Sequence, residues 1–375
     1  MQVTPALNAG GVETVTLDIA RAAVGAGARS LVASRGGRLE GELEKGGGEL
    51  IRLPIDSRNP VTVALNTGRL ERVIRRERVS LVHVRSRAPA FSAIAAARRA
   101  GVPVVTTYHG IYGARSALKR WYNGAMTRGD LTIANSAFTR DHILAEHGVD
   151  PEKMVVVPEG VDTARFDPAA VSDERIDAMR AAWGLRVDDP RRVILLPARL
   201  TDWKGQGVMI EALGRMASGP DALLVLTGRA DNTGYLRQLK AIAADADATE
   251  QVRFVGAVGD MPAAYTLADL VVAPSTRPES FGRSVVESAA MKIPVIASPL
   301  GGPAETVIDG ETGWLAAAGD VDAWARAVDL ALSRPLDVLD IMGEAARARV
   351  QALYSLEAMA AATFAVYRRL VERPR

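Results

Sequence analysis

Residues 193–216 read VILLPARLTDWKGQGVMIEALGRM. An apolar run at 193–197 leads into a polar loop that carries Arg199 and Lys204, and after Gly205 the apolar side chains recur at helical spacing. This order predicts a buried strand, a loop at its carboxyl end and an amphipathic helix. A strand that feeds directly into a helix is the repeating unit of a parallel α/β sheet.

The same strand-and-helix unit recurs along the whole chain. In the first half, β-branched runs predict strands at residues 30–34, 49–53, 80–84, 102–107, 130–134 and 154–157, separated by helices at 12–24, 62–76, 88–100 and 137–147. In the second half they predict strands at 193–197, 222–227, 252–255, 270–273 and 294–297, with helices at 205–216, 234–246 and 282–291, and a last helix at 356–371. We therefore expect the α/β fold class, with two Rossmann-like domains.

A proline-bounded segment marks the domain boundary. The 375 residues suggest two domains at roughly 150 residues per domain. Segment 158–190 begins and ends with proline and is rich in acidic side chains, which is typical of a linker. We expect a first domain of residues 1–168 plus 355–375, and a second domain of residues 169–354.

The composition excludes several classes of protein. The chain has no cysteine, which excludes a disulfide scaffold, a thiolate zinc site and a cysteine nucleophile. No apolar run approaches the roughly 18 residues of a membrane-spanning helix. Residues 1–8 lack the basic and apolar segments of a secretory signal. The sequence therefore predicts a cytoplasmic protein.

The two halves of the chain differ in charge. Residues 1–168 carry 23 basic and 17 acidic side chains, a net charge of +6, whereas residues 169–375 carry 23 and 27, a net charge of −4. Such an asymmetry indicates an anionic partner for the first half, although ordinary scatter between two domains gives the same numbers. Nucleic acid is not expected, because the basic residues are not interleaved with aromatic ones and no binding motif is present.

The loop after strand 193–197 has the composition of a diphosphate site. Arg199 and Lys204 are two cations beside the amino terminus of a helix, where the backbone amides also favour anions. Arginine offers a planar fork to phosphate oxygens, and lysine offers a point charge. Two solvated loop cations are the alternative reading of the same residues.

A second motif, RPESFGRSVVE at 277–287, follows the predicted strand 270–273. Glu279 lies in the loop and Glu287 in the second turn of the next helix, so that both carboxylates can accept hydrogen bonds from one polyhydroxylated ligand. The backbone amides of residues 281–284 open that helix and can bind a phosphate. A glutamate pair at this spacing is common by chance, but the Phe-Gly step at a strand–helix junction makes the motif more specific.

Glycines and a histidine follow two strands of the first half. Gly10 and Gly11 follow a short first strand expected at residues 2–4 and precede the helix at 12–24, which lets a ligand approach the backbone closely. They do not complete the dinucleotide-binding fingerprint, which needs more glycines and a distant acidic residue. His109 follows the strand at 102–107, and we expect its side chain to face the space between the two domains.

Taken together, these motifs resemble glycosyltransferase family 4, whose members are retaining, nucleotide-sugar-dependent enzymes of GT-B fold. The resemblance rests on Arg199 with Lys204, Glu279 with Glu287, His109-Gly110, Gly10-Gly11 and the segment PEGVD at 158–162. It covers nearly the whole chain in the family's order. It implies two Rossmann-like domains that face each other across a cleft, and a last helix that returns to the first domain.

The resemblance also implies roles for individual residues. Arg199 and Lys204 would bind the donor diphosphate, Glu279 would contact sugar hydroxyls near the reacting carbon, and His109 would lie beside the transferred sugar. These four would form the catalytic group. The donor-binding residues would be Glu287 on the ribose, the loop 256–259 with Val258 near the base, and the glycines and amides of Gly10, Gly11, Phe281, Gly282, Arg283 and Ser284. Two positions depart from the family pattern: Ala198 replaces a frequent glycine, and Glu159 replaces a frequent asparagine.

The implied reaction moves a hexose from a UDP- or GDP-linked sugar to an acceptor hydroxyl, in the assembly of lipopolysaccharide or another envelope glycan or glycolipid. Neither a cofactor nor a metal is expected, since the Asp-x-Asp sequences at 245–247 and 320–322 fall in a helical stretch and at a helix start, where aspartate caps. Two alternatives are a nucleotide-sugar epimerase of the same fold and a two-domain sugar-binding protein.

Basic residues of the first half suggest where an acceptor could bind. Arg85, Arg87, Lys119 and Arg120 are the candidates on the acceptor side, which would take a glycan or a lipid-linked acceptor. Arg69, Arg72, Arg75 and Arg76 share one helical face. Such surfaces are either solvated or attracted to the anionic inner face of the cytoplasmic membrane, where the protein would then be peripheral.

Overall fold

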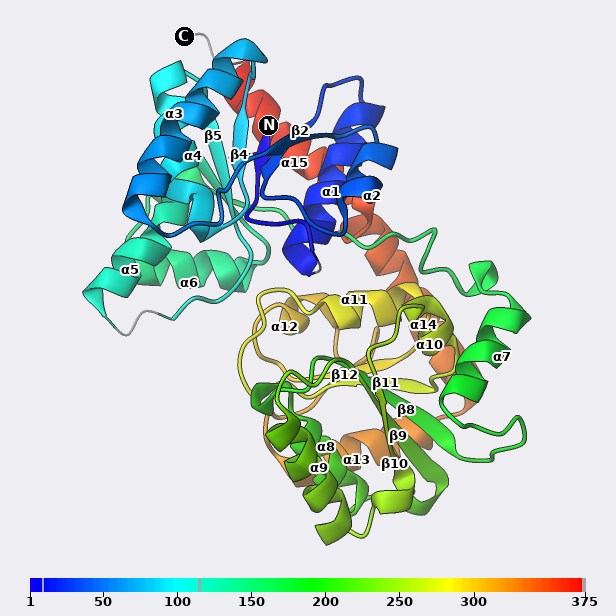
Figure 1. Ribbon diagram of the computed structural model, residues 1–375. Coiled ribbons are helices and arrows are strands. Elements are labelled where there is room, and N and C mark those ends of the chain that lie inside the picture. Colours follow the sequence, from blue (N-terminus) through cyan, green and yellow to red (C-terminus); the bar gives the residue numbers. More distant parts are fainter. Residues whose placement is uncertain (9, 114–115, 373–375) are drawn as a thin grey trace. The chain divides into compact units, whose positions relative to one another are not determined.

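The computed structural model describes residues 1–8, 10–113 and 116–372 (Figure 1). The chain forms two compact units, Met1–Gly160 with Leu356–Arg375, and Val161–Ser355. Each unit contains one parallel sheet with helices around it, as the alternating pattern predicts. Residues 373–375 of the predicted first domain lie outside the described residues.

The first unit contains a seven-stranded sheet in the order β3-β2-β1-β4-β5-β6-β7. All of its strand pairs are parallel. Its strands are β1 (Gln2–Val3), β2 (Leu31–Ser34), β3 (Glu49–Arg52), β4 (Val82–Val84), β5 (Val104–Tyr108), β6 (Leu131–Ala134) and β7 (Met154–Val156). The predicted strands 30–34 to 154–157 match these within two residues at either end.

The helices of the first unit begin and end at residues suited to those positions. Its helices are α1 (Gly11–Gly25), α2 (Glu40–Lys45), α3 (Pro60–Arg76), α4 (Arg87–Ala100), α5 (Ala117–Asn123), α6 (Ala137–His147) and α15 (Leu356–Val371). Asn59 caps α3 by accepting from the backbone amides of Val61 and Thr62, and Pro60 occupies the first helical turn. Gly101 and Gly148 end α4 and α6 in the left-handed conformation.

The second unit contains a six-stranded parallel sheet in the order β10-β9-β8-β11-β12-β13. Its strands are β8 (Arg192–Pro197), β9 (Ala222–Thr227), β10 (Val252–Gly256), β11 (Leu270–Ala273), β12 (Val295–Ala297) and β13 (Trp314–Leu315). Its helices are α7 (Asp173–Ala182), α8 (Gln206–Leu213), α9 (Thr233–Asp245), α10 (Met261–Thr266), α11 (Arg283–Ala290), α12 (Pro303–Thr306), α13 (Val321–Leu332) and α14 (Leu336–Leu353).

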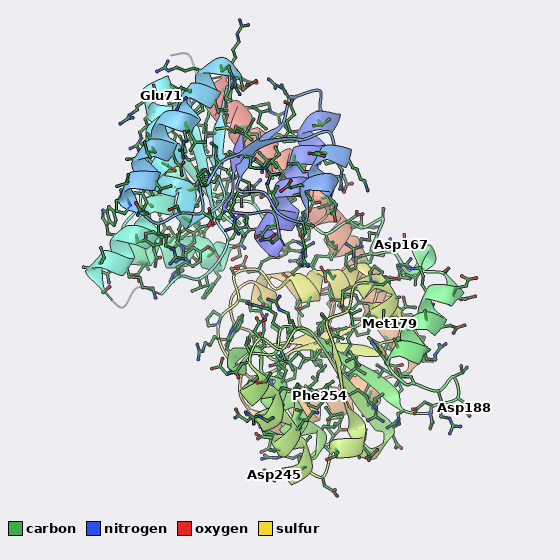
Figure 2. The ribbon with its side chains drawn as sticks, viewed as in Figure 1. Glu71, Asp167, Met179, Asp188, Asp245 and Phe254 are labelled. Atoms are coloured by element: carbon green, nitrogen blue, oxygen red, sulfur yellow. The ribbon has the colours of Figure 1, made fainter. Side chains whose placement is uncertain are left out.

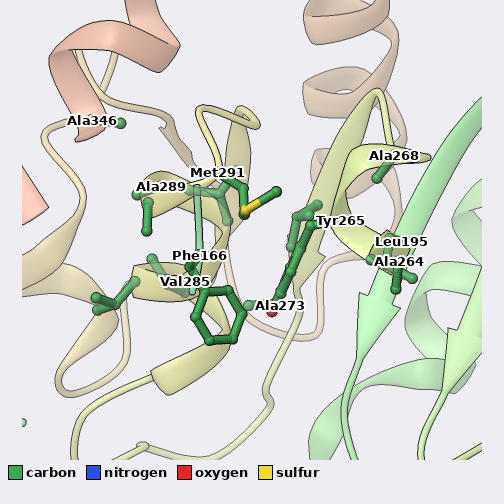
Figure 3. Close-up of a cluster of buried hydrophobic side chains, with 14 of the residues drawn as sticks. Phe166, Leu195, Ala264, Tyr265, Ala268, Ala273, Val285, Ala289, Met291 and Ala346 are labelled. Carbon is green, nitrogen blue, oxygen red and sulfur yellow. The ribbon is translucent and has the colours of Figure 1, made fainter. Parts of the chain in front are cut away.

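The inner strands of each sheet, such as β5, β9 and β11, are buried on both faces, which explains why they are mostly apolar runs. In the second unit, one face packs against a cluster that includes Phe166, Tyr265 and Val285, drawn in Figure 3. Trp324 of α13 and Met209 of α8 are fully buried against the opposite face. In the first unit, α15 packs its buried side chains Met359, Val366 and Leu370 against α1. The last helix therefore belongs to the first unit, as predicted.

The segment between the two series of strands is not an unstructured linker. Residues 173–182 of the predicted linker 158–190 form α7, which packs on α10 and is joined to it by the Arg175–Asp260 ion pair. The division between the units lies after Gly160, earlier than the predicted residue 168. The physical reason is that Val161 and Phe166 are buried in the core of the second unit, and Arg347 binds both Phe166 and Asp167.

Candidate active site

The strand order of the second sheet reverses between β8 and β11, because the chain leaves this central pair in opposite directions. Ligands of open α/β sheets bind beyond the carboxyl ends of the strands at such a switch point. The segment after β8 carries Arg199 and Lys204, and the segment after β11 carries Glu279. The topology thus brings two motifs together that are far apart in sequence.

Gly205 allows the two segments to meet. It adopts the left-handed conformation with φ +75°, and a Cβ atom here would lie 1.9 Å from the carbonyl oxygen of Pro274. Any other residue would therefore push the start of α8 away from the segment after β11. Two hydrogen bonds to the carbonyl of Trp203, from the amide and the hydroxyl of Thr276, join the same segments.

Lys204 and Glu279 form an ion pair at the switch point. The Nζ atom of Lys204 lies 2.7 Å from Oε2 of Glu279, and the two side chains are 17% and 12% exposed. The hydroxyl of Ser275 donates to the other carboxylate oxygen, and the ammonium lies 4.6 Å from the ring centroid of Trp203. A cation and a carboxylate are thus held at one small, mostly dehydrated position, within reach of a single ligand.

Arg199 lies apart from this pair. Its side chain is 64% exposed, and its guanidinium is 4.0 Å from the carboxylate of Asp231, which also binds Arg229. Gln206 fixes the loop that carries Arg199, because its side chain donates to the Arg199 carbonyl and accepts from the hydroxyl of Tyr235. The backbone of Arg199 is therefore fixed, whereas its guanidinium is exposed to solvent.

The backbone around Glu279 is held against a glycine pair that follows β12. A Cβ atom on Gly301, which has φ +80°, would lie 2.1 Å from the Glu279 carbonyl oxygen, and the amide of Gly302 donates to that same oxygen. These contacts align residues 279–281 with 301–302 as a short parallel bridge. The carboxylate of Glu279 thus projects from an anchored backbone.

Glu287 is held by two donors at the start of α11. Nε of Arg283 donates to one carboxylate oxygen at 2.9 Å, and the hydroxyl of Tyr265 lies 3.1 Å from the other. Burial, together with the Glu287 charge, raises the pKa of the Tyr265 phenol well above its usual range, so Tyr265 remains a neutral donor. Figure 3 shows Tyr265 among the apolar side chains that surround it. The orientation of Glu287 is therefore determined from the interior of the unit.

The other predicted donor-binding residues lie near this helix start. Gly282 is the N-cap residue of α11 in the left-handed conformation, and Ser284 lies in the first turn, where amides lack intrahelical acceptors. The side chain of Phe281 is buried against Tyr354, so only its backbone could reach a ligand. Val258 is partly buried in the loop between β10 and α10.

In the first unit, three neighbouring strands bring polar residues to one edge of the sheet. Nδ1 of His109, which follows β5, lies 3.2 Å from Oε1 of Glu159, which comes after β7. Asn135, which follows β6, donates to the same oxygen at 3.1 Å. A Cβ atom on Gly11, at the start of α1, would lie 3.9 Å from the other oxygen of Glu159. Glu159, which departs from the family pattern, thus interacts directly with His109.

Arg85 is not placed to meet an acceptor. It is buried at the end of β4, and its guanidinium donates twice to the side-chain oxygen of Gln2. Burial lowers the pKa of Arg85 from its usual value. Arg87 lies nearer the surface, where it donates to Asn123 and stacks 3.7 Å above the ring of Tyr112. The strand-end position alone did not distinguish these two arginines.

Lys119 and Arg120 lie on the exposed helix α5, with Arg120 paired to Glu146. Trp121 beside them is 53% exposed and stacks on Phe91, with Arg128 over its ring. On α3 the predicted cationic face is partly neutralised: Arg75 pairs with Glu71 and Arg76 with Glu77, whereas Arg69 binds Asn66.

The Asp-x-Asp sequences lie outside these clusters. Asp320 caps α13, as predicted, by accepting from the amide of Ala323. Asp245 is the last residue of α9, at the edge of the second unit in Figure 2. Within the described ranges, no three histidine or acidic side chains come together as a metal site would require.

Four residues of the site were not identified from the sequence: Ser275, Tyr265, Asn135 and Asp231. Asn135 and Ser275 each follow an apolar strand closely, which is a usable signal, because strand ends are where ligands bind. Tyr265 could not be found in this way. It lies within helix α10, and only the tertiary structure brings its hydroxyl to Glu287 of α11.

Two families match the chain. Residues 9–165 match the family described as Glycosyltransferase Family 4, and residues 179–349 match the family described as Glycosyl transferases group 1. A GDP-mannose-dependent alpha-(1-6)-phosphatidylinositol monomannoside mannosyltransferase of Mycolicibacterium smegmatis is 32% identical over 299 residues, which cover 74% of this chain and 75% of that protein.

Solved structures share the fold. A glycosyltransferase from Rickettsia africae ESF-5 superposes with a TM-score of 0.91 and 30% identity, covering 100% of this chain and 98% of that one. Anabaena HepE, in complex with UDP and glucose, gives a TM-score of 0.84 and 22% identity, covering 99% and 100%, a likeness of fold alone. The α/β fold class of GT-B type, with one parallel sheet in each of two units, is thus confirmed.

Proposed function

The chain belongs to glycosyltransferase family 4, and from this premise we propose that it transfers a hexose, with retention, from a nucleotide-diphosphate sugar to an acceptor hydroxyl. The observation that carries the proposal is the Lys204–Glu279 pair at the switch point of the second sheet. A nucleotide sugar needs a cation for its diphosphate next to an acceptor group for its sugar hydroxyls, and this pair supplies both.

Lys204 and Arg199 stabilise the leaving diphosphate in this proposal. As the bond to the anomeric carbon breaks, negative charge grows on the phosphate oxygens, and a preorganised cation in a poorly hydrated position is most effective against it. The Lys204 side chain is only 17% exposed, so water screens its charge only weakly. Two cations supply the charge that a divalent metal provides in other transferases, which supports a metal-independent reaction.

Glu287 and Glu279 orient the donor. Glu287, held by Arg283 and Tyr265, accepts from the ribose hydroxyls, while Glu279 accepts from the transferred sugar. The base meets the loop at 256–259 in this proposal. The M. smegmatis relative is GDP-mannose-dependent, and HepE has been solved in complex with UDP. We propose a UDP- or GDP-linked donor and no cofactor.

The acceptor is a glycan or lipid-linked glycan of the cell envelope. The M. smegmatis relative acts on a phosphatidylinositol monomannoside. The net charge of +6 on residues 1–168 and the exposed Leu118 and Trp121 of α5, beside Lys119, favour contact with an anionic lipid surface. Within the described part of the chain, every helix falls short of what a bilayer span needs. We therefore propose a cytoplasmic protein that binds the membrane peripherally.

A donor screen tests the proposal. Thermal-shift titrations with UDP-, GDP- and ADP-sugars should identify one donor class, and transfer to glycolipid extracts should then be followed by NMR of the product's anomeric proton. We expect the anomeric configuration of the donor in the product, and a rate that does not change with EDTA. Hydrolysis, epimerisation or inversion in place of retained transfer would contradict the proposal.

A vesicle assay tests the membrane contact. Co-sedimentation with phosphatidylglycerol vesicles should exceed that with phosphatidylcholine vesicles and should fall as salt is raised, because the attraction is electrostatic. Trp121→Ala should weaken binding to anionic vesicles, and the same change at Trp314, in the second unit, should not. Equal binding to both kinds of vesicle would remove the electrostatic argument.

A further inference from the structure

Glu159 is a buried carboxylate in the first unit, and glycosyl transfer by Lys204 and its neighbours gives it no function. The residue is 8% exposed and follows the edge strand β7, whereas Asn135 follows β6, its neighbour, and His109 follows β5, the next strand. His109 and Asn135 both direct a nitrogen at the same oxygen of Glu159, at 3.2 and 3.1 Å. Parallel pairing of β5, β6 and β7 therefore builds a three-residue cluster at one edge of the sheet.

The position of Glu159 favours the charged form of its carboxylate. Burying an ionised carboxylate costs several kcal/mol unless partners compensate it. Here two N–H donors do so, and the carboxylate also lies at the amino terminus of the 15-residue helix α1, close to Gly11, where the helix dipole favours negative charge. An ionised Glu159 is thus compatible with its burial.

We propose that Glu159 is a positioning residue for His109, which it holds in the tautomer protonated at Nδ1. An ionised carboxylate has only acceptor sites, so the facing imidazole nitrogen must carry the proton. In the neutral ring, Nε2 is then an acceptor and can receive a hydrogen bond from a hydroxyl group. The substrate side of this inference rests on the proposed function, in which the hydroxyl belongs to the transferred sugar.

His83 in the same unit shows why the partner matters. Its two ring nitrogens face the hydroxyls of Tyr367 and Thr107, at 2.6 Å each. A hydroxyl can donate or accept, so these partners do not impose one tautomer. A carboxylate imposes one, and glutamine at 159 would not, because an amide offers both an acceptor oxygen and a donor nitrogen.

NMR of the ring nitrogens tests the proposal without any substrate. The chain has four histidines, so ¹⁵N-histidine labelling gives a spectrum that His109→Gln can assign. We expect His109 protonated at Nδ1 in the intact chain, and a shift toward the Nε2-protonated form in Glu159→Gln. Glu49→Gln, which makes the same change at an exposed ion pair with Arg29, should leave His109 unchanged. A His109 tautomer that is the same in Glu159→Gln as in the intact chain would overturn the proposal.

Kinetics separate positioning from a structural effect. Glu159→Gln should lower kcat for transfer roughly 10- to 100-fold, which corresponds to the loss of one hydrogen bond to a charged group. The KM for the nucleotide sugar should change little, because the proposed nucleotide contacts lie in the second unit. In a His109→Gln background, Glu159→Gln should have no further effect. An equal loss in both backgrounds would show that Glu159 does not act through His109.

Failure of the proposed function and failure of the inference about Glu159 give different results. If the intact chain transfers no sugar to any acceptor, the proposed function is wrong, whereas the tautomer of His109 still reports on Glu159. If transfer is observed and the tautomer does not respond to Glu159→Gln, only the positioning inference is wrong.

Discussion

The two sheets share one architecture, but different polar groups lie beyond the carboxyl ends of their strands. In the second unit, the central strand pair β8 and β11 presents Lys204 and Glu279, two opposite charges that remain 17% and 12% exposed. In the first unit, Arg85 follows β4 of the corresponding pair, β1 and β4, but its guanidinium is buried against Gln2, the first residue of β1. The polar residues lie instead beyond β5 to β7, around one carboxylate.

This difference shows that strand order provides a location but not its chemistry. In the second unit the polar residues lie on loops, held by close contacts between segments of backbone, and this suits binding of a charged ligand. In the first unit His109 and Asn135 follow β5 and β6 directly, Glu159 is the third residue after β7, and the three side chains hold one another. We thus expect residues at the carboxyl edge of the second unit's sheet to stabilise charge on a ligand, and residues at the carboxyl edge of the first unit's sheet to orient its hydroxyl groups.

The largest effect is expected at Lys204. Lys204→Ala should lower kcat/KM about 100- to 1000-fold, or roughly 3–4 kcal/mol, because a preorganised charge opposite the leaving diphosphate is lost. Initial-rate kinetics with the donor found by screening provide the measurement. Lys240→Ala, an exposed lysine on α9, is the control and should keep the full rate. Equal rates for the two variants would place the diphosphate elsewhere.

A smaller effect is expected when the segments that follow β8 and β11 in the second unit are pushed apart. Gly205→Ala should destabilise the second unit by about 2–4 kcal/mol, since its Cβ would overlap the Pro274 carbonyl. Gly319→Ala is the control, because Gly319 has the same left-handed conformation at φ +76° with no atom within 4 Å. It should cost only about 1 kcal/mol. Thermal unfolding measures both, and similar losses would mean that the close contact carries no cost.

The two units should also respond differently to mild acid. Burial lowers the pKa of His83 well below 6.5, so below that pH the unfolded chain takes up a proton that the folded unit does not. Stability of the first unit is therefore lost as pH falls, by up to about 2 kcal/mol at pH 5. The second unit contains no histidine.

Carboxylates of the second unit respond only at lower pH. A hydrogen bond from Arg191 lowers the pKa of Asp189 to about 2, so its contribution is present above pH 3.8 and is lost below it. Hydrogen exchange, corrected for intrinsic rates, should therefore show loss of protection in β4 and β5 between pH 7 and 5, and none in β8 and β9. His83→Gln should flatten the response of the first unit. Parallel losses in both units would contradict this difference.

The smallest effect is expected at Tyr265. Tyr265→Phe removes one hydrogen bond to Glu287 while keeping the ring in the core, which should raise the KM of the donor several-fold, or about 1 kcal/mol. Arg283 still holds the other oxygen. Initial rates at varied donor concentration measure the change. Tyr122→Phe, in the first unit, is the control. An equal change in this variant would contradict a role of Tyr265 in donor binding.

Much of the fold could be predicted because its signals are local. The runs at 222–227 and 270–273 and the helices at 137–147 and 356–371 agree with β9, β11, α6 and α15. Helix α7 was missed because its composition is polar and acidic and prolines flank it. Its stability comes from packing on α10, and a contact of that kind leaves no periodic signal in the sequence.

The site could be predicted only in part. Lys204 and Glu279 were identified because they lie in loops that follow strands, where ligands of α/β sheets bind, and Glu287 because it lies in the second turn of the helix after Glu279. The structure brings Lys204 and Glu279 together. Arg85 was a wrong candidate for acceptor contact. A strand-end arginine can be buried when an acceptor such as the Gln2 side-chain oxygen binds its guanidinium. Contacts of the proposed donor and acceptor remain predictions.

The sequence by itself determined most of the strands and helices, the two α/β units and the strand-end motifs. These follow from residue type and spacing, which act over a few residues, and the family followed from the resemblance that the motifs carry. Only the tertiary structure decided that Glu159 faces His109, that Tyr265 and Arg283 hold Glu287, and that Arg85 is buried. The reason is physical: each of these contacts depends on which strands become neighbours and how closely helices pack, and both are settled by burial of the whole core.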